Sequence, residues 1–178
     1  TLLKDIFNSE PKNWKIINLR YFNPIGAHES GLLGERPNGL PTNIFPIILK
    51  VASKKMKKLM VFGKDWNTKD GTGVRDYIHV MDVVEAHINS LEFLFRMDSK
   101  FLNLNLGTGI GTSVLELIDT FEKVNNVKVP YIFTKKRKGD SAVTVADNSL
   151  LKSVLDWHPK RTIEDMCRDG WNWQKNQD

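Results

Sequence analysis

The sequence predicts an α/β fold, in which short apolar strands alternate with amphipathic helices. Two strand patterns and one helical pattern predict it. Residues 16–19 form a nearly continuous apolar run, typical of a strand that is buried on both faces in a parallel sheet. Residues 102–106 alternate leucine with asparagine, which indicates a half-buried strand. Between them, residues 84–95 place apolar side chains at helical spacing.

The first quarter of the chain predicts a helix, a strand, a long loop and a second helix. Residues 1–7 have helical apolar spacing with no capping residue or initiator methionine before them, so the chain is expected to begin inside a helix. Residues 21–41 hold four glycines and three prolines, and ordered loops of this length usually bind something. Thr42 and Asn43 then cap a helix with one apolar face.

The middle of the chain predicts strands at residues 59–63 and 74–80, and a helix that starts at Asp82. The apolar face of this helix consists of Val84, Ile88, Leu91 and Phe95. The glycine-rich loop 107–112 imitates a dinucleotide-binding loop. Its third glycine comes too early for that motif, so a structural turn before a helix is favoured. Ser113 and Glu116 have the spacing of a capping box for that helix.

The last third predicts a strand at residues 130–133 and helices near residues 149–155 and 162–173. Cys167 lies on the inner stripe of the final helix, which favours a buried thiol over a reactive one. It is the single cysteine of the chain, so an internal disulfide is excluded. This cysteine usage agrees with a reducing compartment, and a cytoplasmic location is expected.

The composition excludes several classes of partner. The chain has 178 residues, of which 40% are hydrophobic and 26% charged, as in a globular domain with a real core. No apolar run approaches the ~20 residues that span a bilayer, so no membrane partner is expected. The net charge of +5 permits nucleic-acid binding. However, the basic clusters are short and lack stacking aromatics, so no nucleic-acid partner is expected. Histidine and cysteine spacing predicts no metal site.

The most informative residue is Arg75, which lies between a glycine-rich loop and an apolar strand. A planar guanidinium can hold a phosphate bidentately, although Arg75 and the aspartate after it could equally form a surface ion pair. Two other segments, 19–28 and 136–140, also end structured elements with polar groups and glycine. In the second of these, Arg137 can neutralise a diphosphate and Asp140 can accept hydrogen bonds from ribose hydroxyls.

These three segments together resemble the C-terminal half of the UDP-glucose 4-epimerases, a family of extended short-chain dehydrogenases/reductases. The resemblance covers nearly the whole chain and implies a single fragment. In it, about 25–79 and 126–178 form the substrate domain, whereas 1–24 and about 80–125 belong to an incomplete Rossmann domain. In such enzymes the glycine-rich dinucleotide site and the helix that carries the Tyr-x-x-x-Lys pair are expected to come before the segments that this sequence matches. The resemblance therefore places the catalytic base and most of the NAD site in a missing N-terminal half, and no catalytic residue in this chain.

The resemblance implies a role for each matching residue. It implies contacts to the UDP-sugar from Asn23, Asn43, Met60, Phe62, Arg75, Arg137, Asp140 and Thr144. Phe62 suits an apolar wall for the base, beside backbone groups of the strand that read the uracil edge. Tyr21 and Phe22 are implied to lie next to the nicotinamide of NAD. Without the resemblance, Phe22 is typical of a core aromatic and Asn43 of a helix cap, although a helix N-terminus attracts anions in any case.

The implied reaction interconverts UDP-glucose and UDP-galactose. NAD takes a hydride from C4 of the sugar, the keto sugar rotates about the diphosphate, and the hydride returns to the other face. This chain supplies the grip on UDP, so alone it is expected to be inactive. It is also expected to dimerise or to pair with an N-terminal half, because its strands lose their neighbours. The alternatives are another nucleotide-sugar reductase, such as a dehydratase or decarboxylase, and a non-catalytic UDP-sugar-binding module.

Overall fold

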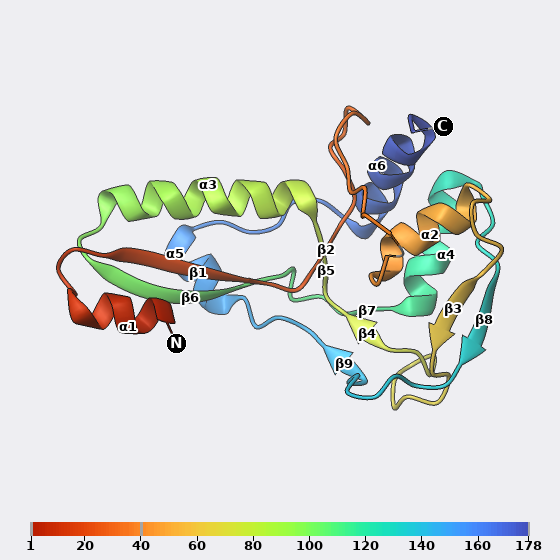
Figure 1. Cartoon of the computed structure of the whole chain (residues 1–178), viewed down its shortest axis with the longest axis horizontal. Helices are drawn as coiled ribbons and strands as arrows, with labels where there is room; N and C mark the ends of the chain where they lie inside the picture. The colour runs from red at the N-terminus through yellow and green to blue at the C-terminus, as the bar shows by residue number, and fades with distance from the viewer. Residues whose placement is uncertain (1, 40, 178) are drawn as a thin grey trace.

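The computed structural model describes residues 2–39 and 41–177 and has the predicted mixed α/β fold (Figure 1). Three pairs of parallel strands form its main sheets: β1 (Lys15–Tyr21) with β6 (Lys100–Leu106), β2 (Asn23–Ile25) with β5 (Tyr77–His79), and β3 (Leu59–Phe62) with β8 (Tyr131–Thr134). A small mixed sheet has β4 (Val74–Arg75) between β7 (Thr112–Ser113) and β9 (Val143–Thr144).

Helices cover these strands at both ends of the long axis. In chain order they are α1 (Leu2–Ser9), α2 (Ile44–Ala52), α3 (Val80–Arg96), α4 (Val114–Asn125), α5 (Ser149–Leu155) and α6 (Ile163–Lys175). Figure 1 shows α1, α3 and α5 around β1 and β6, and α2, α4 and α6 at the other end with β3 and β8. No helix in the described ranges is long and apolar enough to cross a membrane.

Buried apolar side chains form two clusters. One joins α2, α4 and α6, with Phe45, Phe121 and Met166 among its members. The other joins α3, β6 and α5. Strand β5 contributes to both, because its successive residues Tyr77 and Ile78 point to opposite faces of the strand.

The domain boundaries inferred from the sequence remain a proposal. Packing departs from that division at two helices. The division assigns α4 to the incomplete Rossmann domain, but α4 shares its apolar cluster with α2 and α6. It assigns α5 to the substrate domain, but α5 lies against β6 in the second cluster. Each helix packs where a complementary apolar face lies, and position along the chain does not predict which face that is.

Helix α3 differs from the prediction in its start and in its buried face. It begins at Val80 rather than Asp82, because the Nδ1 atom of His79 caps it by accepting a hydrogen bond from the Met81 N–H at 3.0 Å. The predicted apolar face is exposed: the fractions for Val84, Ile88, Leu91 and Phe95 are 43%, 54%, 54% and 77%. The face that packs on the strands instead contains Asp82, Val83, Ala86 and Ser90.

Strand β1 also differs from the prediction. Its residues 16–19 are only partly buried, rather than buried on both faces. The reason is that β1 pairs with β6 alone among the described strands, so its other edge has no neighbour there. Together with the exposed face of α3, this leaves one end of the molecule with apolar surface that the described residues do not cover.

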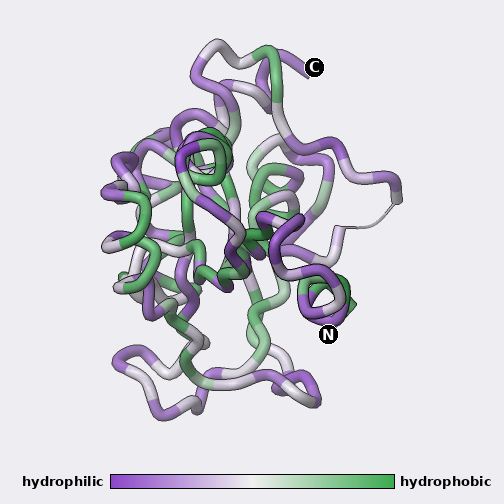
Figure 2. The backbone as a smooth tube through the Cα atoms, turned by 90° about the vertical axis from the view of Figure 1, so that its left-hand side faces the viewer, coloured by the Kyte–Doolittle hydropathy of each residue, from purple (hydrophilic) through white to green (hydrophobic). Residues whose placement is uncertain are grey.

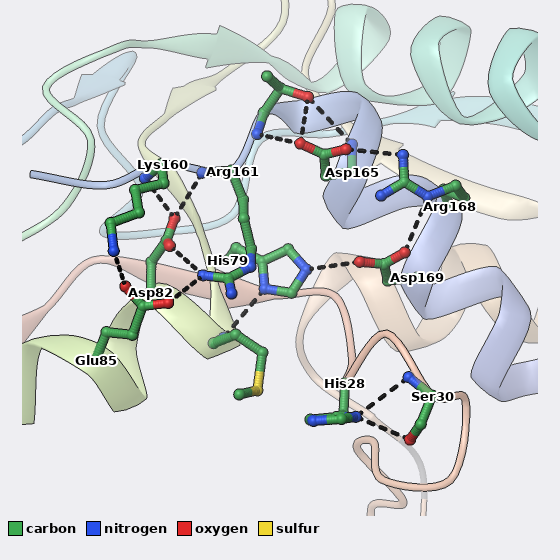
Figure 3. Close-up of polar contacts among 12 residues, drawn as sticks. His28, Ser30, His79, Asp82, Glu85, Lys160, Arg161, Asp165, Arg168 and Asp169 are labelled. Atoms are coloured by element: carbon green, nitrogen blue, oxygen red, sulfur yellow. Dashed lines mark hydrogen bonds and ion pairs between the residues drawn. The ribbon is translucent and has the colours of Figure 1, made fainter.

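A buried polar network connects α3 to α6 (Figure 3). The imidazole of His79 is fully buried, and its Nε2 atom lies 3.3 Å from an oxygen of Asp169. The Asp82 carboxylate is also fully buried and accepts a hydrogen bond from the Arg161 guanidinium at 2.6 Å. Burial lowers the pKa of His79, although the neighbouring Asp169 acts to raise it. The network therefore holds a neutral histidine between two elements that are distant in sequence.

Candidate functional site

A cleft with a volume of ≈ 130 Å³ lies between β3, β4, α2 and the basic loop that follows β8. Seven of the eight predicted substrate-binding residues line it: Asn23, Asn43, Met60, Phe62, Arg75, Arg137 and Asp140. Ligand pockets usually start at about 300 Å³. The cleft is thus large enough for part of a nucleotide sugar only.

Strand β3 presents Met60 and Phe62 to the cleft side. Leu59 and Val61 each have only 1% of their surface exposed, whereas Met60 is half exposed. This alternation follows from the two-residue period of a strand, which sends neighbouring side chains to opposite faces. One face of β3 therefore anchors the strand in the core while the other provides the apolar wall.

Arg75 lies in β4, and its side chain is hydrogen-bonded to the backbone of the preceding residue. Its Nη1 atom donates a hydrogen bond to the Val74 carbonyl at 2.8 Å, and it forms no ion pair with any carboxylate in the described ranges. The alternative of a surface ion pair with Asp76 is wrong, because that carboxylate is fully buried and bonded elsewhere. The guanidinium retains donors for an anionic ligand.

Asp76 fixes the strand that carries Arg75. Its two carboxylate oxygens accept hydrogen bonds from the N–H groups of Thr108, Gly109 and Ala146 at 2.8, 2.8 and 3.1 Å. The Thr108 hydroxyl adds a fourth at 2.7 Å. This buried carboxylate splits the predicted strand 74–80 into β4 and β5 and ties both to the loop after β6.

The glycine-rich loop before Arg75 is closed by Asp70. Its carboxylate accepts hydrogen bonds from the Thr72 N–H at 2.8 Å, from the Thr72 hydroxyl at 2.7 Å and from the Ser113 hydroxyl. Burial acts to raise the pKa of Asp70, but the hydrogen bonds from Ser113 and Thr72 hold it below its ordinary value. Asp70 is therefore a structural anion that links the loop to the start of α4, and Ser113 and Glu116 form the predicted capping box.

Arg137 and Asp140 come from the basic loop and face each other. The Arg137 Nε atom lies 3.0 Å from an oxygen of Asp140, and the guanidinium carbon lies 4.7 Å from the centre of the Phe62 ring. A cation over an aromatic face is attracted by the ring quadrupole. The loop is thereby folded against the apolar wall of the cleft.

Asn23 and Asn43 complete the polar lining. Asn23 lies in β2, where its N–H donates to the Asp76 carbonyl at 3.0 Å. Asn43 occupies the N-cap position of α2, but its side chain makes no capping hydrogen bond. The helix begins at the cleft with uncapped N–H groups, and such a terminus attracts anions.

Three predicted residues lie outside the cleft. Thr144, in β9, pairs with Arg75 across the strands but is exposed, and its hydroxyl lies 2.7 Å from that of Ser141. Tyr21 ends β1 with half of its surface exposed, and its hydroxyl lies 2.6 Å from the Nε2 atom of His87. Phe22 follows it and is partly buried. Tyr21 and Phe22 thus lie at the carboxyl end of a parallel pair, where α/β sheets commonly bind ligands.

A larger cavity of ≈ 720 Å³ lies between the loop after β6 and the segment that joins α5 to α6. It contains none of the predicted site residues. Its wall includes Arg161, which is already paired with Asp82 and Glu85. It also includes Trp157, whose buried indole N–H has no hydrogen-bond partner among the described residues. Nothing in this cavity resembles a nucleotide site, so its size does not decide the function.

Comparison with known proteins assigns the chain to a family. The family model described as GDP-mannose 4,6 dehydratase matches residues 8–170. The chain belongs to this family. Among its relatives, UDP-glucose 4-epimerase from Pasteurella multocida is 50% identical over 98% of this chain and 51% of its own length.

Solved structures of UDP-glucose 4-epimerases have the same fold as this chain. A UDP-glucose-4-epimerase from Stenotrophomonas maltophila, with bound NAD and formylated UDP-arabinopyranose, superimposes with a TM-score of 0.95 at 48% identity, covering 99% of this chain and 52% of that one. A UDP-glucose 4-epimerase from Bifidobacterium longum, in complex with NAD⁺ and UDP, gives 0.93 at 44% identity, with coverages of 98% and 51%. The predicted resemblance to UDP-glucose 4-epimerases is confirmed, as is the fold. The chain spans about half the length of the curated relatives it matches.

Two aromatic residues of the cleft wall, Trp66 and Tyr77, were not predicted from the sequence. Burial raises the pKa of Tyr77 to about 12, although nearby Arg75 acts to lower it, so its hydroxyl stays protonated as a donor. The alternation of a strand would have placed Tyr77 on the same face as Arg75. No local pattern indicated Trp66, which lies in the loop after β3. In the described part of the chain, no cluster of His, Cys, Asp and Glu could hold a metal ion.

Proposed function

We propose that this chain is the UDP-sugar-binding half of an enzyme that interconverts UDP-glucose and UDP-galactose. One observation carries the proposal: Arg75, Arg137 and Asp140 come from segments distant in sequence and line a single cleft with Phe62. Two guanidinium groups suit a diphosphate, a carboxylate suits vicinal ribose hydroxyls, and an aromatic wall suits a base. The names of the relatives at 48–50% identity support a sugar nucleotide of the UDP type.

The proposal assigns NAD to the complete enzyme, mainly to a part outside this chain. When bound, NAD supplies hydride transfer to and from C4 of the sugar. Tyr21 and Phe22, at the carboxyl end of β1, are the residues of this chain proposed to contact NAD. No described segment forms a glycine-rich dinucleotide loop, because the loop 107–112 leads into the capping box of α4. The chain's own contribution is to grip UDP firmly through charge and stacking while the hexose stays free to turn.

A second candidate keeps the same cleft but changes the reaction. The family description names a dehydratase, so another nucleotide-sugar reductase could use this UDP grip. The two reactions differ in the half that would supply the base. We favour the epimerase because the relatives at 48–50% identity carry that name. A cytoplasmic location is proposed as well, on the cysteine usage alone.

The experiment that tests the grip is calorimetric titration of the 178-residue chain with UDP. We expect Arg75→Met and Arg137→Met each to weaken binding by about tenfold or more, because each removes charge-assisted hydrogen bonds to phosphate. Arg96→Met is the matched control, because Arg96 is an exposed arginine at the end of α3. Equal affinity in all four proteins would remove the support for this cleft. Binding of an oligonucleotide that UDP fails to displace would contradict the proposal directly.

A further inference from the structure

A second cation–aromatic contact lies beside the one that involves Arg137. The Nζ atom of Lys136 lies 4.4 Å from the centre of the Trp66 ring, while the Arg137 guanidinium lies 4.7 Å from that of Phe62. Two consecutive cations of the basic loop therefore lie over two aromatic rings, one at the end of β3 and one in the loop that follows it. Figure 1 shows the loops that follow β3 and β8 close together, and Figure 2 shows largely hydrophilic loops at the bottom of its view.

Further contacts hold Lys136 and Trp66 in this position. Lys136 donates a hydrogen bond to the Asp65 carbonyl at 3.1 Å and pairs with the Asp65 carboxylate at 3.1 Å. The indole N–H of Trp66 donates to the Phe62 carbonyl at 3.1 Å. Trp66, which contacts Lys136, is thus hydrogen-bonded to Phe62, which contacts Arg137.

Gly63 makes this packing possible. Its φ of +86° lies in the left-handed region, which favours glycine. A Cβ atom there would lie 2.4 Å from the Trp66 Nε1 atom and 2.9 Å from the Lys136 Cγ atom. The N–H of Gly63 also donates to the Thr134 carbonyl at 2.9 Å, which continues the pairing of β3 with β8. The turn at Gly63 brings the indole and the lysine into contact at the end of the strand pair.

We infer that Trp66 and Lys136 form a clamp that positions Arg137 over Phe62, at the wall of the cleft. The two consecutive loop cations lie differently: Lys136 contacts Asp65 and Trp66 and does not line the cleft, whereas Arg137 lines the cleft together with its partners Asp140 and Phe62. A loop held in its binding geometry beforehand loses less conformational entropy when a ligand arrives. Trp66 and Lys136 are positioning residues in this scheme, and their effect on UDP affinity rests on the proposed function.

The test measures the loop first without ligand. Hydrogen exchange of residues 135–140 in the intact chain reports local opening directly. Lys136→Met is expected to speed exchange in this loop by about tenfold, because it removes one cation–aromatic contact and one ion pair. Trp66→Leu removes the cation–aromatic contact and the indole hydrogen bond, and is expected to speed exchange by a similar factor. Lys138→Met is the matched control, because it removes the same charge from the same loop at an exposed position. Lys136→Arg and Trp66→Phe retain the cation and the ring, and should restore most of the protection.

Two results overturn the clamp. One is exchange in Lys136→Met equal to that in Lys138→Met. The other is equal exchange in Trp66→Leu and Trp66→Phe. Exchange in the core helices, measured in the same experiment, identifies any variant that fails to fold.

UDP titration of the same proteins tests the connection to the ligand. Lys136→Met should weaken UDP binding more than Lys138→Met does. If unmodified protein binds no UDP, the proposed function fails, while the exchange data still decide whether the clamp exists.

Discussion

Asp76 accepts four hydrogen bonds from residues that are distant in sequence. The residues around it in the chain gave no indication of them. Its buried carboxylate accepts three backbone N–H groups and one hydroxyl, from the loop after β6 and from the residues that follow β9. Each buried donor left without a partner costs roughly 1–3 kcal/mol. The carboxylate therefore holds the backbone next to Arg75 in position.

We expect Asp76→Ala to lower the free energy of unfolding by about 3 kcal/mol, because it removes the shared acceptor of three N–H groups, of which that of Ala146 is buried. Urea denaturation measures this loss. Asp119→Ala, at an exposed position of α4, is the control and should change stability by less than about 0.5 kcal/mol. Similar unfolding midpoints for both variants would show that the buried network is not structural.

His79 predicts a dependence of stability on pH. Because burial lowers its pKa in the folded state, the unfolded chain binds the proton more readily once the pH falls below the ordinary value of 6.5. The free energy of unfolding should therefore decrease as the pH falls from 7.5 to 5.5. In His79→Gln the decrease should be smaller. A steeper or unchanged decrease in that variant would contradict the assignment.

The small side chain of Thr144 leads to a prediction about which sugars the complete enzyme accepts. The resemblance to bacterial UDP-glucose 4-epimerases implies a bulky tyrosine at this position, at the hexose end of the site, and a threonine there would leave room for an N-acetyl group. In a complete enzyme that contains this chain, we expect turnover of UDP-N-acetylglucosamine as well as UDP-glucose, and Thr144→Tyr should reduce the former selectively. Steady-state assays with both sugars test this. Turnover with the N-acetyl sugar below about a thousandth of that with UDP-glucose, a barrier difference of about 4 kcal/mol, would contradict it.

At the scale of elements, α3 is the informative case. Its apolar face, Val84, Ile88, Leu91 and Phe95, is exposed, and β1 has an unpaired edge among the described strands. Apolar surface of this kind commonly lies at an interface. We therefore propose that a second copy of the chain, or the half that carries the Rossmann site, covers this end of the molecule.

The double variant Ile88→Lys with Leu91→Glu tests this proposal. Both side chains are more than half exposed, so the substitutions should leave the fold of the isolated chain intact. They should abolish self-association, which light scattering during gel filtration measures. An unmodified chain that is strictly monomeric and highly stable would contradict the proposal.

Pattern reasoning succeeded where an element is specified locally. The capping box of α4 needs only Ser113 and Glu116, and the alternation in β6 needs only its own residues. Burial of Cys167 was predicted from helical spacing and is confirmed, and burial raises the pKa of its thiol to about 12. The buried face of α3 was predicted wrongly because periodicity identifies an apolar face but not the neighbour that covers it.

At the scale of the whole molecule, the site is divided between regions. The cleft proposed to bind UDP lies among β3, β4 and α2, whereas Tyr21 ends β1, a strand that packs against the other apolar cluster. The sequence lacks the glycine-rich dinucleotide site of the family it resembles. Its one Tyr-x-x-x-Lys spacing, Tyr131 and Lys135, runs from strand β8 into the basic loop rather than along a helix. We therefore expect purified chain to bind UDP without interconverting UDP-glucose and UDP-galactose. A coupled assay with added NAD measures this, and any turnover above a denatured control would contradict the expectation.

The sequence by itself determined the α/β class, most of the helices and strands, and the residue types from which a diphosphate site is proposed, because these depend on spacing and side-chain chemistry along the chain. Only the tertiary structure decided that Arg75, Arg137 and Asp140 share one cleft. It alone revealed that Asp76 is a buried acceptor rather than an ion-pair partner, and that Lys136 of the basic loop lies over the Trp66 ring. The physical reason is that each of these facts depends on contacts between segments far apart in sequence, and local periodicity contains no information about which segments meet.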